Sequence, residues 1–79
     1  MEAYKNKKEC DKALEELSRY HGKKIDTAKI RINEHGDTVQ DLFIDTEYIG
    51  YRIRENITEV FVLDLLKKWR PVVVPAGSN

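Results

Sequence analysis

Hydrophobic and polar residues follow a regular pattern in five segments of the chain, and the first segment has the period of a helix. Between Cys10 and Leu17, apolar residues recur at intervals of three and four, which places them on one helical face. Asn6 stands where a helix N-cap is expected, and Gly22 stands where a left-handed C-cap is expected. The pattern predicts a helix over Lys7–His21.

The next three segments alternate between apolar and polar residues with the period of two that is typical of strands. They are residues 27–33, 38–45 and 48–54. Gly36 in the first connection suits the left-handed position of a three-residue hairpin loop. The second connection, around residues 45–48, suits an even-numbered loop. We therefore predict an antiparallel meander of three strands.

The lengths of these two loops also predict the register of the meander. They place Lys29 opposite Asp41 on one side and Arg52 opposite Asp41 on the other, and cross-strand pairs of opposite charge stabilise a sheet. The same register pairs Ile44 with Ile49. One face of the meander is then an apolar core face, which carries Ile30, Ile32, Leu42 and Ile44.

The fifth segment, residues 57–69, contains signals for both a helix and a strand. Asn56 and Glu59 repeat the capping pattern that precedes the first helix, and Leu65 and Trp69 share one helical face. The run from Val60 to Val62 favours a strand instead. We predict a helix here, with a strand as the alternative.

The predicted element order is α-β-β-β-α, which is an α+β fold. It is a two-layer sandwich in which two helices cover one face of a three-stranded antiparallel meander. If the fifth segment is a strand, the alternative is a small β-barrel with an N-terminal helix. With 79 residues the chain is expected to form a single domain, 1–79, with frayed ends at 1–5 and 76–79.

The composition of the chain argues against several classes of protein. The chain has 14 basic and 14 acidic residues, so it lacks the basic excess of a dedicated duplex DNA binder. Its single cysteine excludes an intramolecular disulfide, and its polar start lacks the apolar segment of a signal peptide. No apolar run approaches the length of a membrane span. We therefore expect a cytoplasmic protein that does not enter a membrane.

Candidate chemistry is sparse along the whole sequence. The two histidines have no cysteine or carboxylate at the spacing of a metal site, and no nucleophile lies in an elbow motif. Cys10 shares the apolar face of the first helix, which predicts a core position rather than a reactive thiol. We predict no catalytic residues, no cofactor, no metal and no enzymatic activity.

The function that fits these observations best is a small non-enzymatic module, regulator or inhibitor that binds another protein. An extended apolar tail follows the fifth segment, and such a tail can add as a strand to a partner or to a second copy of the chain. It can equally complete the core of its own domain, and a truncation after Arg70 separates the two. The candidate interface residues are Phe61, Trp69, Val72, Val73 and Val74.

The alternative function, which ranks second, is binding of single-stranded RNA or DNA on the exposed face of the sheet. Basic residues interleaved with aromatic rings on a sheet are typical of such sites, because bases stack on rings and phosphates contact cations. Asp41 in the middle of this face opposes the interpretation. The candidate nucleic-acid face carries Lys29, Arg31, Phe43, Tyr48, Arg52 and Arg54.

Overall fold

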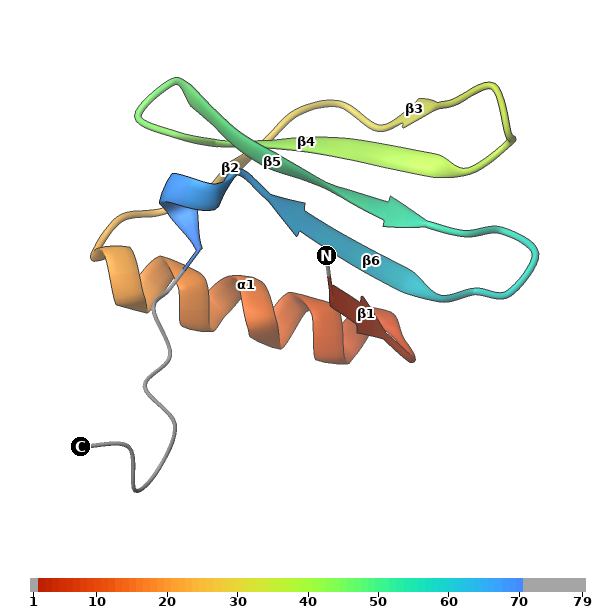
Figure 1. Ribbon diagram of the computed structural model, residues 1–79, viewed down its shortest axis with the longest axis horizontal. Coiled ribbons are helices and arrows are strands. Elements are labelled where there is room, and N and C mark those ends of the chain that lie inside the picture. Colours follow the sequence, from red (N-terminus) through yellow and green to blue (C-terminus); the bar gives the residue numbers. More distant parts are fainter. Residues whose placement is uncertain (1, 71–79) are drawn as a thin grey trace.

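The structure of the protein is a computed structural model that describes residues 2–70 (Figure 1). One helix and six strands form an α+β fold, with a short 3-10 helix near the end of the described chain. In chain order the elements are β1 (Glu2–Tyr4), α1 (Lys7–His21), β2 (Asp26–Thr27), β3 (Arg31–Ile32), β4 (Thr38–Ile44), β5 (Glu47–Arg54), β6 (Phe61–Leu65) and η1 (Lys67–Trp69).

The six strands form one open antiparallel sheet in the order β1-β6-β5-β4-β2, and β3 pairs with the same edge of β4 as β2 does. The first and last strands of the described chain are therefore neighbours. Helix α1 lies along one face of this sheet (Figure 1). No helix within residues 2–70 has the length and apolar character needed to cross a membrane.

Helix α1 begins and ends at the predicted residues, because its caps are encoded locally. The Asn6 side chain accepts a hydrogen bond of 2.9 Å from the Glu9 amide. At the other end Gly22 has a φ of 66°, and its amide donates to the Arg19 carbonyl. Leu17 and Cys10 are the buried residues of the helix, as the apolar period predicts.

The core lies between α1 and the middle of the sheet. Its buried cluster consists of Leu17 from the helix and four sheet residues, none more than 5% exposed. Burying an aliphatic side chain of this size is worth about 1.5–3 kcal/mol, so these few residues provide most of the stabilising apolar contact. The sheet residues are Leu42, Ile44, Ile49 and Leu63.

The predicted second helix over residues 57–69 is wrong. The segment forms β6 and η1, and β6 pairs with β1 on one side and β5 on the other. The cap-like residues belong to a turn: the Asn56 side chain donates to the Gly36 carbonyl, and Glu59 has a left-handed φ of 57°. The strand preference of residues 60–62 therefore prevails, because two neighbouring strands pair with them.

The strand alternative for this segment is therefore correct, but the barrel that accompanied it is not, because the sheet keeps two edges, β1 and β2. One helix covers the sheet in place of the predicted two. Residues 2–4, which were expected within a frayed end, form β1. The other predicted frayed end, 76–79, lies outside the described residues.

The predicted strand over residues 27–33 is divided into β2 and β3 by a one-residue shift in pairing. β3 has the predicted register, with Arg31 opposite Val39, whereas β2 pairs Thr27 with Leu42. The pairing shifts at Ala28, whose amide donates to the Asp41 carbonyl. Lys29 therefore does not lie opposite Asp41 as predicted. β3 lies at the edge of the sheet, where two aliphatic residues of the predicted core face, Ile30 and Ile32, are 63% and 64% exposed.

The predicted pairing between β4 and β5 is wrong by two residues next to the turn and by one residue beyond it. Asp45 and Thr46 form a two-residue turn with φ values of 49° and 67°, so Ile44 pairs with Glu47 rather than Ile49. An irregularity between residues 42 and 43 shifts the remaining pairs, and Asp41 lies opposite Tyr51 instead of Arg52. Arg52 consequently projects from the same face of the sheet as α1.

At Gly50 the backbone of β6 occupies the space that a side chain would need. This glycine has a φ of 149°, which other residues rarely adopt. A Cβ atom at this position would lie 2.2 Å from the carbonyl oxygen of Asp64. The strand pairing at this point therefore requires glycine.

Candidate functional site

A groove with a volume of about 480 Å³ lies beside the first residues of α1. Its floor is the part of the sheet in which Thr38 and Gln40 of β4 pair with Arg54 and Arg52 of β5. We call it the α1-start groove. The residues that line it are Lys5, Asn6, Lys7, Ile30, Thr38, Gln40, Arg52, Arg54, Glu59 and Phe61.

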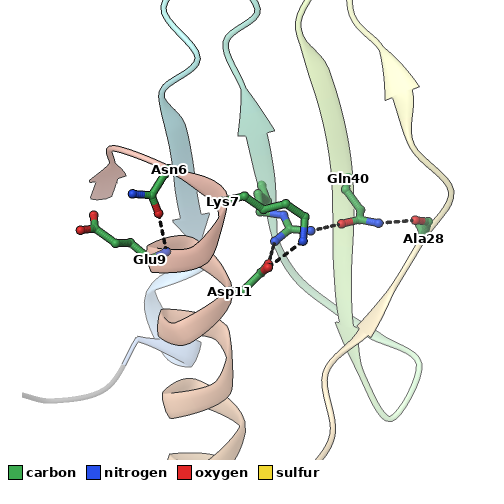
Figure 2. Close-up of polar contacts among 7 residues, drawn as sticks. Asn6, Lys7, Glu9, Asp11, Ala28 and Gln40 are labelled. Atoms are coloured by element: carbon green, nitrogen blue, oxygen red, sulfur yellow. Dashed lines mark hydrogen bonds and ion pairs between the residues drawn. The ribbon is translucent and has the colours of Figure 1, made fainter.

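Arg52 joins the helix to the sheet at the floor of this groove. Its guanidinium donates to Asp11 Oδ1 at 2.6 Å and to Gln40 Oε1 at 2.7 Å. Gln40 in turn donates to the Ala28 carbonyl at 3.2 Å, and Lys7 donates to the second oxygen of Asp11 (Figure 2). Hydrogen bonds therefore run from the first turn of α1, across two central strands, to the edge of the sheet.

This network controls the charge of Asp11. Partial burial by itself would raise the pKa of its carboxyl group, but hydrogen bonds from Lys7 and Arg52 outweigh it and hold the pKa below the usual value. The Arg52 side chain is only 15% exposed, so its charge is held in a fixed position. The floor of the groove is therefore pre-organised and polar.

Cys10 of α1 does not line the groove, and its side chain is fully buried next to Arg52. Burial is the main cause that raises the pKa of its thiol, although the nearby Arg52 guanidinium lowers it in part. Its predicted position in the core is confirmed.

The outer rim of the groove carries charges that are less constrained. Arg54 contacts Glu59 Oε1 through a nitrogen 3.3 Å away, and both side chains are substantially exposed. Lys5 is exposed and forms no ion pair with any carboxylate in residues 2–70. Two aliphatic or aromatic side chains, Ile30 and Phe61, flank this rim.

The sheet separates the residues of the predicted nucleic-acid face. Arg52 and Arg54 line the groove on the α1 side, because the register differs from the predicted one by a residue. Phe43 lies between two core residues of β4 and so projects from the opposite face, where its ring contacts Tyr48 with a centroid distance of 5.9 Å. Arg31 shares that outer face, and Lys29 is exposed in the link between β2 and β3.

The outer face of the sheet balances positive with negative charge. Arg31 lies 3.4 Å from Asp41, and Arg70 donates to Asp64 at 2.9 Å. Tyr51 also donates to Asp64, and this hydrogen bond is the main cause of the raised pKa of the Tyr51 hydroxyl. Tyr51, Asp64 and Arg70 were absent from the sequence-based prediction, since only the correct register brings them together.

The predicted protein interface is also divided. Phe61 lines the α1-start groove, whereas Trp69 packs against the core and donates from Nε1 to Glu47 at 3.1 Å. The Trp69 ring also meets the ring of His21, with a centroid distance of 5.1 Å. Trp69 is thus half-buried and packs against its own domain. The other predicted interface residues, Val72, Val73 and Val74, lie outside the described residues.

Histidines, cysteine and carboxylates do not converge in groups of three anywhere in residues 2–70, so this part of the chain presents no candidate metal centre. Comparison of the chain with protein-family models, with curated proteins and with solved structures gives no match. The groove and the outer face of the sheet are therefore the two surfaces from which a function can be inferred.

Proposed function

We propose that this protein is a small, non-enzymatic, cytoplasmic module that binds an extended segment of a partner protein in the α1-start groove. The observation that carries the proposal is the groove itself. Its volume of about 480 Å³ lies within the range of ligand sites, and the exposed Ile30 and the half-buried Phe61 flank a polar floor. The lone cysteine is in keeping with a cytoplasmic location, because small secreted domains usually contain several disulfides.

The rigidity of the floor supports a binding role. Thr38, Gln40, Arg52 and Arg54 project from paired strands, and the hydrogen bonds of Arg52 fix it between α1 and β4. A site held in place before binding loses less conformational entropy when a ligand arrives. A short peptide could then bind without ordering the surface that receives it.

The apolar flank supports a polypeptide as the ligand. Ile30 is 63% exposed although it is aliphatic, and Phe61 lies on the other side of the same groove. Exposed apolar side chains beside a groove are typical of surfaces that bury an apolar side chain of a partner. Phe61 is thereby retained from the predicted interface residues.

Peptide display can test this proposal with a matched pair of variants. A random peptide library is selected on the wild-type protein, and the enriched peptides are measured against Ile30→Ala and Ile32→Ala. The two isoleucines are 63% and 64% exposed, but only Ile30 lines the groove. We expect peptides that lose affinity for Ile30→Ala and keep it for Ile32→Ala. Selection of no peptide, or equal binding to both variants, would refute the proposed site.

A second candidate function, single-stranded nucleic-acid binding, is favoured by the Phe43–Tyr48 ring contact beside Arg31 on the outer face. The ion pair of Arg31 with Asp41 weakens it, because that carboxylate repels phosphate. It predicts that a mixed oligonucleotide binds with an affinity that falls steeply with salt and that Phe43→Ala weakens the binding. Salt-independent binding would contradict it.

A further inference from the structure

The α1-start groove has a local excess of positive charge in a chain whose formal net charge is zero. Four cations line it, whereas within residues 2–70 the carboxylates that pair with them are only Asp11 and Glu59. Asp11 accepts from both Lys7 and Arg52, so it offsets one of the two inner charges and holds both cations in place. The rim cations, Lys5 and Arg54, are offset only by the exposed Glu59.

The ion pair between Glu59 and Arg54 shows that the Arg54 guanidinium can bind a carboxylate. The turn before β6 holds Glu59 at a φ of 57°, a conformation that residues other than glycine seldom adopt. From this turn the carboxylate reaches Arg54 with a separation of 3.3 Å, and the two side chains are 73% and 44% exposed. An exposed pair of this kind contributes little to stability. An incoming carboxylate can therefore displace it at small cost.

We infer that the groove binds an acidic, extended segment of a partner protein, one carboxylate of which replaces that of Glu59 on Arg54. This inference rests on the proposed function and names the partner class. Lys5 provides the second charge contact, and an apolar side chain of the segment lies between Ile30 and Phe61. The resulting ligand pattern alternates acidic and apolar residues.

The same observations favour a peptide over a nucleic acid at this site. Among the groove residues within 2–70, Phe61 provides the only aromatic ring, so successive bases have no series of rings on which to stack. The flanking Ile30 and Phe61 instead suit the side chains of a polypeptide. Phosphate binding remains a distinct outcome of the test.

The test measures fluorescence anisotropy with a labelled peptide in which glutamate and valine alternate. A control peptide carries glutamine in place of each glutamate, and we expect it to bind about tenfold more weakly. Arg54→Gln should weaken binding of the acidic peptide about threefold to tenfold, whereas Arg19→Gln, an equal charge change on the exposed last turn of α1, should leave it unchanged.

Two further variants act on the rim without disturbing the fold. Lys5→Gln should weaken binding and Lys24→Gln should not, since both lysines are exposed but only Lys5 lines the groove. Glu59→Asn should strengthen binding about threefold, because it removes the internal competitor while asparagine tolerates the left-handed backbone. Opposite effects of Glu59→Asn and Arg54→Gln are specific to displacement of one carboxylate by another.

Three outcomes would overturn the inference. Equal affinity for the acidic and glutamine peptides would do so, as would binding that ignores Arg54→Gln and Lys5→Gln. A single-stranded oligonucleotide that binds more tightly than the acidic peptide, and weakens with Lys5→Gln, would assign the rim to phosphates instead. If Ile30-dependent peptides still emerge from the display library in the first two cases, the proposed function survives and only the acidic class of partner is rejected.

Discussion

Replacement of Gly50 by alanine tests whether the pairing of β5 with β6 requires glycine at this position. The added Cβ would lie 2.2 Å from the Asp64 oxygen and 2.8 Å from the Leu65 Cα, and neither backbone atom can move without separating β5 from β6. The φ of 149° adds a conformational cost of about 1–3 kcal/mol, and overpacking adds about 1–3 kcal/mol more. We expect Gly50→Ala to lower the free energy of unfolding by about 2–6 kcal/mol.

That loss is large for a domain of this size. A chain of 79 residues has a free energy of unfolding of about 4–12 kcal/mol at the usual ~0.05–0.15 kcal/mol per residue. Urea unfolding followed by far-UV circular dichroism would measure the change, with the slope of the free energy against urea as a check that the unfolded state is unaltered. At the upper end of the range the variant would be largely unfolded without denaturant.

Two other glycines separate the backbone cost from the steric one. Gly22 and Gly36 have φ values of 66° and 80°, and a Cβ atom at either would meet nothing within 4 Å. Their alanine variants should each lose only about 1–2 kcal/mol, the cost of a left-handed alanine. If Gly50→Ala loses no more than Gly36→Ala, the argument for a steric requirement at Gly50 is refuted.

Three further predictions concern the core and the Arg52 network. Arg52→Met removes two hydrogen bonds and leaves Asp11 and Gln40 without this donor. Thermal or urea unfolding should therefore show that the free energy of unfolding falls by about 2 kcal/mol. An unchanged midpoint would contradict the structural role of Arg52. Because the folded-state pKa of Asp11 is lowered, its contribution to stability is complete above about pH 5 and is lost progressively as the pH falls below that value. Asp11→Asn should therefore flatten the stability profile in that acidic range. The buried Cys10 thiol should react with an alkylating reagent at pH 8 far more slowly in the folded protein than in urea, and equal rates would show that it is accessible.

Local signals account for the parts of the fold that could be predicted. Helix α1 was predicted to the residue because its cap bonds involve neighbours in sequence, Asn6 with Glu9 and Gly22 with Arg19. β4 and β5 were predicted within a few residues because apolar residues alternate in both, more regularly in β5 than in β4. The local sequence is sufficient to specify such elements, and tertiary packing does not change their bounds.

The remaining elements depend on distant pairing that no local pattern reveals. The Asn56 and Glu59 spacing resembles a helix cap, yet both residues form a turn, since β6 gains pairing partners in β1 and β5. Thr46 adopts a left-handed conformation that β-branched residues seldom occupy, although Asp45 before it is a common residue in such turns, so the tight turn and its register were missed. A one-residue error in register exchanges the two faces of a strand, and it moved Arg52 from the outer face to the groove.

The candidate site was predictable only in fragments for the same reason. Arg52, Arg54 and Phe61 were all singled out, but they were assigned to two different surfaces. The structure brings them together in one groove with Ile30, which the alternating pattern had placed in the core. The site exists because the first residues of α1, two central strands and a sheet edge meet at one place.

Because β1 pairs with β6, the sheet cannot be completed until late in translation. Glu2–Tyr4 are translated before every other strand, yet they cannot pair until Phe61–Leu65 have left the ribosome. At ~5–20 residues per second, translation of the intervening chain takes roughly 3–12 seconds. Throughout that interval Leu17 lacks part of its cover, and the β4–β5 hairpin, closed by a two-residue turn, can form near its end, before β6 is available. The nascent chain is therefore expected to be a substrate for holding chaperones until β6 emerges.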